Sequence, residues 1–257
     1  MFEKAKPRDH QYLKKMSTII SANDLSKRFG AFTAVDAISF EVKKGEIFGF
    51  LGANGAGKTT AMKMLTGLMR PSSGQAEVAG FDVYRHPEQI KRHIGYMSQR
   101  FSLYEDLTVR ENIEFYGGIY GLGFRQLRQK IRDLVAELGL GEVERHLVKS
   151  LPLGWRQRLA FSIAIIHDPS IVFLDEPTGG VDPITRRQFW ETIYQSAERG
   201  TTVFVTTHYM DEAEYCDRIS MMSAGKIAAL GAPRTLRETF QASSMDDIFL
   251  AIARGAQ

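Results

Sequence analysis

The eight residues Gly52-Ala53-Asn54-Gly55-Ala56-Gly57-Lys58-Thr59 match the phosphate-binding P-loop pattern GxxxxGK[ST] at every fixed position. The apolar run Ile47–Leu51 before them predicts a buried strand, and residues 59–68 after them predict a helix. A strand, a glycine-rich loop and a helix in this order are the context in which the pattern binds phosphate. The segment therefore predicts a nucleoside triphosphate site, with a chance glycine-rich turn as the alternative.

The residue types in this loop suit a phosphate ligand. Gly52, Gly55 and Gly57 let the backbone bend and come close to an anion. Successive backbone N–H groups and the helix N-terminus then direct partial positive charge at the phosphates. Lys58 is expected to reach the β- and γ-phosphates, and the Thr59 hydroxyl is expected to bind Mg²⁺. The predicted nucleotide-binding set is completed by Ala53, Asn54, Ala56 and Thr60.

The composition is that of an ordinary globular protein with one large or two small domains, since the 257 residues are 44% hydrophobic and 25% charged. The single cysteine, Cys216, cannot form an intramolecular disulfide, which fits a reducing cytosol. No apolar stretch approaches the roughly 18–20 residues needed to span a bilayer, and the N-terminus lacks the apolar core of a secretory signal. We therefore expect a soluble or peripheral protein.

The formal net charge of +3 lies in the N-terminal segment. Residues 1–15 contain five basic and two acidic side chains, and the remainder of the chain is balanced. This balance argues against a nucleic-acid partner. We interpret residues 1–18 as a flexible extension before a single ATP-binding domain at 19–257. Contact with anionic lipid, a disordered tail and a natural start at Met16 are the three interpretations of the extension, and we favour the last two.

The order of the remaining patterns predicts an α/β protein. Short apolar or alternating runs predict strands at 19–24, 37–43, 76–78, 94–97, 171–174 and 202–206, and a hairpin formed by 219–222 and 226–230. Helical periodicity is found at 109–116, 127–138, 183–199 and 246–253. The strand signal is weak from about 100 to 167, so we expect a helical subdomain inserted there.

Two carboxylates, Asp175 and Glu176, directly follow the buried strand predicted at 171–174. At the carboxyl end of a strand they would lie beside the P-loop, where open α/β sheets bind ligands. Asp175 suits Mg²⁺, which prefers carboxylate and water oxygens. Glu176 suits a general base that activates water for attack on the γ-phosphate. Ordinary acidic residues at a strand end are the alternative.

The motifs together resemble those of the ATP-binding subunits of ABC transporters, over roughly residues 19–250. They follow that family's order and are the P-loop, Gln99, Leu151–Arg158, Asp175-Glu176-Pro177-Thr178, Gly180-Val181-Asp182-Pro183 and Thr206-Thr207-His208. The resemblance implies a P-loop ATPase with a mixed RecA-like sheet core, an antiparallel β subdomain and a helical subdomain. It also implies hydrolysis of ATP with Mg²⁺ as cofactor.

The resemblance assigns roles to side chains outside the P-loop. Gln99 is similar to the glutamine that contacts Mg²⁺ and the attacking water, so Thr59, Gln99 and Asp175 form the implied metal set. His208 is similar to the switch histidine that contacts the γ-phosphate and orients water. Its place after the strand predicted at 202–206 puts it at the same edge of the sheet. Glu176, His208 and Gln99 are thus the implied catalytic residues.

Two further residues are assigned by resemblance alone. Phe29 is similar to the aromatic residue that stacks on adenine, although an aromatic residue near a strand end is often part of the core. Asp182 is similar to the D-loop aspartate at the boundary between subunits.

The family signature, usually Leu-Ser-Gly-Gly-Gln, is replaced here by Leu151-Pro152-Leu153-Gly154-Trp155, followed by Arg156-Gln157-Arg158. By resemblance, Leu151 to Trp155 and Gln157 are expected to face the ATP held by a second subunit. Pro152 offers neither a hydroxyl nor a backbone N–H, but it is acceptable in the first turn of a helix whose N-terminus faces an anion. We interpret the segment as a subfamily variant that affects the hydrolysis rate and not ATP binding. A degenerate, weakly active site is the alternative.

This variant resembles ATPases of multidrug and daunorubicin-type exporters, which work with ABC-2-type permeases. The resemblance implies a head-to-tail dimer with a second ATP-binding subunit, either a second copy or a close paralogue, and two ATPs at the interface. It implies an integral membrane permease that docks near Phe101, Leu103 and Tyr104, at the cytoplasmic face of the membrane. The alternative is that these three residues belong to the core of the helical subdomain. The implied function is export of a drug, a lipid-like substance or another small molecule. An ABC importer subunit and a soluble ABC ATPase without transport are the alternative functions.

Overall fold

The structure is a computed structural model that describes residues 17–99 and 103–255. The extension expected at 1–18 therefore lies almost entirely outside the described residues, and so does Phe101. None of the helices within these ranges has the length and apolar composition of a membrane span.

Six strands form the central sheet in the order β10-β9-β3-β8-β7-β6. Neighbouring strands from β9 to β6 are parallel, while β10 pairs antiparallel with β9, so the sheet is mixed as expected. β3, β7 and β8 are buried at every position, because other layers cover both faces of the sheet. The strand bounds are Ile47–Gly52 for β3, Ile94–Met97 for β6, Ile171–Asp175 for β7, Thr202–Thr207 for β8, Arg218–Ser223 for β9 and Lys226–Gly231 for β10.

A second, antiparallel sheet has the order β2-β1-β4-β5, with β1 at Thr18–Phe29, β2 at Phe32–Lys43, β4 at Ser73–Val78 and β5 at Phe81–Asp82. β1 and β2 are about twice as long as the runs predicted at 19–24 and 37–43. The register between them shifts repeatedly, and Asp24 and Ala37 both have φ of 49° at these irregularities. Such bulges interrupt the alternation of buried and exposed side chains, which is why the sequence pattern showed only part of each strand.

Eight α-helices connect the strands within the described residues. Their bounds are Lys58–Leu65 for α2, Pro87–His93 for α3, Val109–Ile119 for α4, Phe124–Glu137 for α5, Leu153–Ala164 for α6, Pro183–Glu198 for α7, Pro233–Phe240 for α8 and Met245–Gly255 for α9. Short 3₁₀ segments lie at Val148–Ser150 (η1) and Met210–Tyr215 (η2). The sequence pattern did not predict α3 or α8, because each buries only one or two side chains. α2 ends at Leu65, earlier than predicted, since Gly67 follows with φ of 71°.

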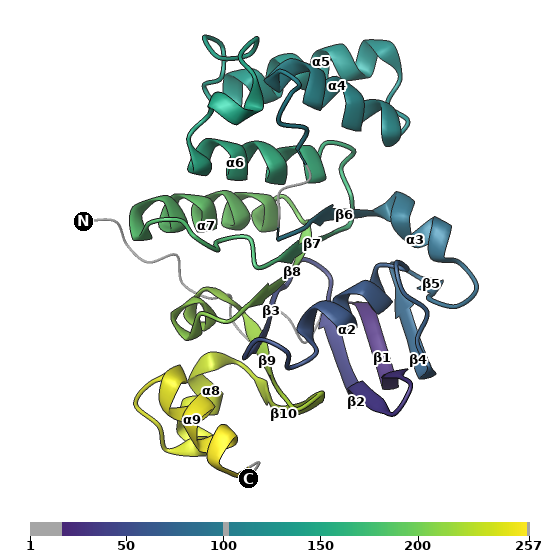
Figure 1. Ribbon diagram of the computed structural model, residues 1–257, viewed down its shortest axis with the longest axis vertical. Helices are drawn as coiled ribbons and strands as arrows, with labels where there is room; N and C mark the ends of the chain where they lie inside the picture. The colour runs from purple at the N-terminus through teal and green to yellow at the C-terminus, as the bar shows by residue number, and fades with distance from the viewer. Residues whose placement is uncertain (1–16, 100–102, 256–257) are drawn as a thin grey trace.

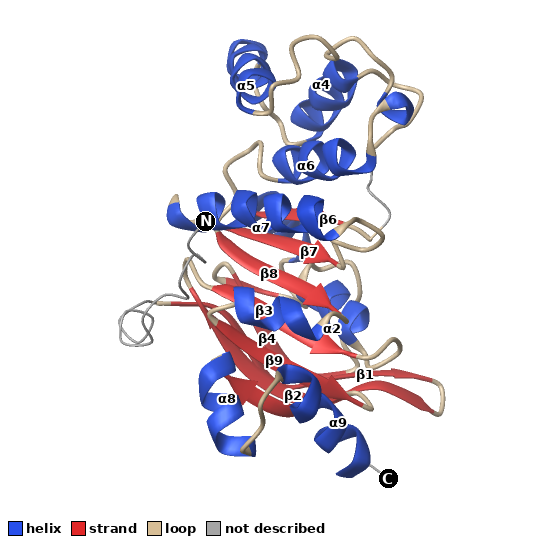
Figure 2. Cartoon of the chain, turned by 90° about the vertical axis from the view of Figure 1, so that its left-hand side faces the viewer, coloured by secondary structure: helices blue, strands red, loops and turns tan. Residues whose placement is uncertain are grey.

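The helices are distributed unevenly around the two sheets. In Figure 1 the segment from α4 to α6 lies at one end of the molecule, α8 and α9 lie at the other, and α7 lies between α6 and the central sheet. Figure 2 shows the same separation from the side, with the strands between the two groups of helices. We propose that the α4 to α6 segment is the helical subdomain expected at about 100–167.

Within the described residues, three apolar clusters hold these layers together. The first lies between the two sheets and includes the packed rings of Phe40, Phe48, Phe50 and Phe204, with centroids 5.3–6.4 Å apart. The second packs α6, α7 and the C-terminal helices on the other face of the central sheet. The third lies within the α4 to α6 segment, which therefore has a core of its own. Burial of apolar surface is the main stabilising term for such layers.

His167 joins the end of the helical segment to the central sheet. Its Nε2 lies 3.1 Å from the carbonyl oxygen of Ile94, so Nε2 carries the proton and donates it. Its ring stacks on Tyr120 with centroids 3.7 Å apart. Nδ1 is buried, with no hydrogen-bond partner among the described residues. Burial lowers the pKa of His167 from its ordinary value, because a second proton would place a charge in this enclosed position.

Candidate functional site

The P-loop connects the end of β3 to the start of α2, as the sequence pattern predicts. Gly57 precedes the helix with φ of 105°, and a Cβ there would lie 2.5 Å from the carbonyl oxygen of Ala34. Gly52 has φ of 154°, and a Cβ there would lie 2.5 Å from the carbonyl oxygen of Met222. Both positions therefore require glycine, because any side chain would collide with backbone.

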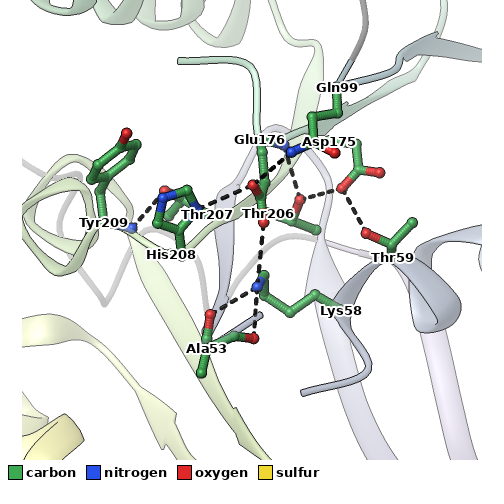
Figure 3. A network of polar contacts seen from close by, with 11 residues as sticks. Ala53, Lys58, Thr59, Gln99, Asp175, Glu176, Thr206, Thr207, His208 and Tyr209 are labelled. Carbon is green, nitrogen blue, oxygen red and sulfur yellow. Dashed lines mark hydrogen bonds and ion pairs between the residues drawn. The ribbon is translucent and has the colours of Figure 1, made fainter. Parts of the chain in front are cut away.

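Lys58 lies inside the loop with only 4% of its side chain exposed. Its Nζ donates to the carbonyl oxygens of Gly52 at 2.7 Å and Ala53 at 3.1 Å, and lies 3.4 Å from Glu176 Oε1 (Figure 3). The ammonium group is thus surrounded by oxygen atoms at the point where the loop turns into the helix. A phosphate group bound here would supply a further anionic partner for the same nitrogen.

One carboxylate oxygen of Asp175 accepts hydrogen bonds from two hydroxyl groups. Thr206 Oγ1 donates to Asp175 Oδ1 at 2.7 Å, and Thr59 Oγ1 donates to the same oxygen at 3.2 Å. Asp175 is 4% exposed and Thr206 is fully buried. Burial and the nearby Asp175 carboxylate raise the pKa of Tyr96 to about 12, so this tyrosine remains neutral beside the site. Hydroxyl and carboxylate oxygens held this close form a donor set that suits Mg²⁺.

Glu176 is the residue on which the polar contacts converge. Oε2 accepts a hydrogen bond from Gln99 Nε2 at 3.1 Å and lies 3.1 Å from His208 Nδ1, while Oε1 faces Lys58 (Figure 3). Its backbone has φ of 47°, uncommon for a residue with a side chain, and its N–H donates to Thr206. Backbone strain of this kind is typical of functional positions, where surrounding contacts hold the conformation.

The register of the parallel strands explains why residues far apart in the chain meet here. β3, β8, β7 and β6 are adjacent and parallel, so their carboxyl ends lie at one edge of the sheet. The P-loop follows β3, His208 follows β8, Asp175 ends β7 and Gln99 follows β6. Open α/β sheets bind ligands at this edge. The cluster predicted from the sequence is therefore brought together by the fold.

Phe29 lies outside this cluster, at the end of β1. Its side chain is 47% exposed and stands under Lys27 Nζ, which is 5.2 Å from the ring centroid. This exposure is not that of a core residue. The strand pairing places Phe29 opposite Phe32, close to Ala34, whose carbonyl oxygen lies against Gly57. The ring is therefore on the hairpin that borders the P-loop, and its contact with adenine stays a prediction.

The variant signature forms the start of α6. Pro152 is the residue before the helix, and its carbonyl oxygen accepts hydrogen bonds from Trp155 and Arg156. Its missing N–H costs nothing at this position. Gly154 faces the first turn of α7, because a Cβ there would lie 2.5 Å from Thr185 Cγ2. The beginning of α6 is thus a regular helix N-terminus despite the proline.

Gln157 departs from the expectation that it faces a second subunit. It is fully buried, and its Nε2 donates to the carbonyl oxygen of Pro177, directly after Glu176. Burial keeps the amide from reaching another chain, so this arrangement favours a role for Gln157 within its own chain. Periodicity in the signature could not reveal this contact, because it joins residues of different elements.

Asp182 is the N-cap of α7. Its Oδ1 accepts from the backbone N–H groups of Ile184 and Thr185, each at 3.0 Å, and Thr185 Oγ1 donates to Oδ2. The hydrogen bonds from Thr185 lower the pKa of Asp182 below its ordinary value. The aspartate therefore fixes the start of α7, whatever it contacts in a second subunit.

Two residues near His208 were assigned no role from the sequence. Thr206 was identified only as part of a predicted strand and of the motif that ends at His208, yet its hydroxyl donates to Asp175 and accepts from the backbone N–H of Glu176. Tyr209 follows His208, and the two rings lie 4.2 Å apart. The signal that could have found them is their position, because Thr206 ends the strand predicted before His208 and Tyr209 directly follows His208.

The model of the family described as ABC transporter matches residues 35–179. The probable multidrug ABC transporter ATP-binding protein YbhF of Escherichia coli (strain K12) is 51% identical over 220 residues, covering 86% of this chain and 38% of that protein. The linearmycin resistance ATP-binding protein LnrL of Bacillus subtilis (strain 168) is 37% identical over 219 residues, covering 85% of this chain and 70% of that protein.

A solved structure of an ATP-binding subunit of an ABC transporter is also similar to this chain. It superposes with a TM-score of 0.82 at 26% identity, covering 92% of this chain and all of that one. The expected α/β architecture is confirmed by this likeness together with the sheet order.

Proposed function

Because this chain belongs to the ABC transporter family of ATP-binding domains, whose members hydrolyse ATP for transport, we propose that it powers the export of a small molecule through a separate membrane permease. The observation that carries the proposal is the convergence of Lys58, Gln99 and His208 on Glu176 at one edge of the sheet. The names of two relatives, one for multidrug transport and one for linearmycin resistance, support export. This chain spans 38% of the length of the former, so the activity of that whole protein carries over only as a proposal.

The P-loop is the proposed cradle for the phosphates of ATP. Lys58 would exchange its bonds to the carbonyl oxygens of Gly52 and Ala53 for bonds to phosphate oxygens, at little cost in hydrogen bonding. The first turn of α2 adds backbone N–H groups and the helix dipole. Phe29 would stack on adenine, because its exposed ring borders the loop.

Mg²⁺ fits the oxygens beside the loop. Thr59 and Asp175 would hold it, since Thr59 Oγ1 lies 3.2 Å from Asp175 Oδ1. Gln99 would add its amide oxygen from the same edge of the sheet, where its amide nitrogen donates to Glu176. No cluster of three acidic, histidine or cysteine ligands occurs at residues 17–99 or 103–255, so phosphate and water oxygens would complete the coordination. When bound, the ion would neutralise charge on the phosphates.

Glu176 is the proposed general base. It would take a proton from a water molecule whose oxygen attacks the γ-phosphorus, while the bond to the β-phosphate oxygen breaks and ADP leaves with that electron pair. Gln99 and His208 hold the carboxylate from two sides, which fixes its orientation for this transfer. His208 is also placed to contact the γ-phosphate, since it follows the strand next to the P-loop strand.

A second ATP-binding subunit is the proposed partner at this site. The helix N-terminus of α6, with the N–H groups of Leu153 and Gly154, would face the phosphates held by that subunit. Asp182 at the start of α7 would lie at the same boundary. Gln157 is left out of this set because it is buried against Pro177.

The permease is the other proposed partner. Leu103 packs inward against two apolar clusters, but Tyr104 is 50% exposed and its ring lies 4.9 Å from that of Phe115, which is 42% exposed. These two aromatic residues form an exposed apolar surface, and Tyr104 lies only a few residues after Gln99 in the chain. Contact with a cytoplasmic loop of the permease would connect that loop to the site.

Copurification from detergent-solubilised membranes tests the proposal. A tagged chain should retain an integral membrane protein of the ABC-2 permease type, and Tyr104→Ser with Phe115→Ser should release it while ATP binding persists. Recovery with ribosomes or DNA alone would contradict transport. Recovery with a permease and a substrate-binding protein would favour the importer alternative.

A further inference from the structure

One face of α7 holds the segment that follows His208. Arg186, Trp190 and Tyr194 recur every four residues and therefore lie on one side of the helix. Trp190 Nε1 donates to Glu212 Oε1 at 3.3 Å, and Tyr194 donates its hydroxyl proton to the carbonyl oxygen of Tyr215 at 2.9 Å. The 3₁₀ segment η2 is thus attached to α7 at several points.

Arg186 contacts Tyr209, the residue after His208. Its guanidinium carbon lies 4.1 Å from the centroid of the Tyr209 ring, within the range of a cation–π interaction. The same side chain lies 3.4 Å from Asp211 and 3.7 Å from Glu212. Only 17% of it is exposed, so the interaction is partly shielded from water.

Tyr209 in turn packs against the imidazole of His208. The rings of Tyr209 and His208 lie 4.2 Å apart, and the N–H of Tyr209 donates to Thr207 Oγ1 at 3.0 Å. Figure 3 shows Tyr209 on one side of His208 and Glu176 on the other. The imidazole therefore lies between a ring held by α7 and the proposed catalytic carboxylate.

Glu212 is a second group that holds the Arg186 side chain in place. Its side chain is fully buried, and burial raises its pKa above the ordinary value. Trp190 donates to this carboxylate and Arg186 lies beside it, so two of the groups that contact Glu212 come from α7. A buried acidic group between these two side chains fixes the distance between α7 and the segment after His208.

We propose that Arg186 is a positioning residue, which holds the Tyr209 ring and through it sets the place of His208 beside Glu176. This inference rests on the catalytic role proposed for His208. Arg186 lies one helical turn after Asp182, the N-cap of α7. A displacement of the start of α7 by a second subunit would therefore reach His208 through this side chain.

The test measures steady-state hydrolysis, ATP affinity and thermal stability for a set of variants. Arg186→Gln should lower kcat about tenfold and leave the Kd for ATP within about twofold, because the P-loop is untouched. Arg186→Lys keeps a cation over the ring and should recover part of kcat. Arg199→Gln removes an arginine from the other end of α7 and should be unchanged, since its ion pair with Glu137 is exposed.

A double-variant cycle separates positioning from a general structural role. Tyr209→Leu keeps all charges and should lower kcat as Arg186→Gln does, and the two together should be no worse than Tyr209→Leu alone. A combined loss of about a hundredfold would show that Arg186 does not act through Tyr209. If Arg186→Gln folds poorly, wild-type kcat in Tyr209→Leu would by itself overturn the inference.

His208→Ala distinguishes the two possible failures. Wild-type turnover in His208→Ala would refute the proposed role of His208 and this inference with it. Loss of turnover in His208→Ala, together with full turnover in Arg186→Gln, would refute only the inference.

Discussion

Replacing Lys58 with alanine removes the cation at the centre of the site, which should lower both the stability of the protein and its affinity for ATP. Glu176, 11% exposed, would lose the ammonium group 3.4 Å away but keep Gln99 and His208. Removing one partner of a buried pair costs about 3–5 kcal/mol, and the remaining contacts favour the lower end. For a chain of this size, about 3 kcal/mol corresponds to a fall in Tm of roughly 6–12 °C.

The same change should weaken ATP binding. A hydrogen bond to a charged group contributes about 1.5–3 kcal/mol, so the Kd for ATP should rise roughly ten- to hundredfold. Titration calorimetry in the cold measures the affinity, and a thermal melt without nucleotide measures the stability. Lys63→Ala removes a lysine from the same helix and serves as the matched control.

The double variant Lys58→Ala with Glu176→Gln separates the two effects. It removes both charges, so most of the lost stability should return while ATP affinity stays low. A Kd for ATP in Lys58→Ala within about twofold of wild type would refute the role of Lys58 in phosphate binding. The account of the ion pair fails if the double variant melts no higher than Lys58→Ala.

Three further predictions concern the loop, the helical segment and the signature. Gly57→Ala should abolish ATP binding and lower Tm, because its Cβ would collide with the Ala34 carbonyl oxygen; ATP titration of the folded variant showing normal affinity would contradict this. The pKa of His167 is lowered from 6.5, so the folded protein takes up a proton on this ring less readily than the unfolded chain does. The stability that comes from the neutral His167 ring is therefore lost as pH falls. The free energy of unfolding should thus fall more steeply in wild type than in His167→Phe between about pH 7.5 and 5.5, and parallel curves in denaturant titrations would refute the assignment. Pro152→Ser with Leu153→Gly should retain turnover and dimerisation, as measured by phosphate release and light scattering, and loss of dimerisation would count against the proposed signature role.

The sequence predicted the cluster at the sheet edge because its signals are local. The P-loop, the Asp175-Glu176 pair and His208 each follow an apolar run that predicts a buried strand, and parallel strands place their carboxyl ends together. Lys58, Asp175 and Glu176 therefore needed no long-range information to be recognised, whereas His208 was assigned by its resemblance to the switch histidine. The confirmed fold follows from the same order of strands and helices.

Contacts between different elements could not be read in this way. Gln157 was expected to face a second subunit, yet it is buried against Pro177, twenty residues away. Arg186 and Tyr209 are separated in the chain by the rest of α7 and by β8, and nothing in their local patterns links them. The bulged strands β1 and β2 were underestimated because Asp24 and Ala37 break their alternation.

Glu176 is the proposed base, and the P-loop that would hold the phosphates is a different segment of the chain. Phosphate release and ATP affinity measured on Glu176→Gln test this most directly. The amide keeps the size of the side chain but cannot accept the proton, so kcat should fall by about a hundredfold or more, with ATP affinity retained and a closed ATP-bound dimer accumulating. Turnover at the wild-type rate in this variant would contradict the account.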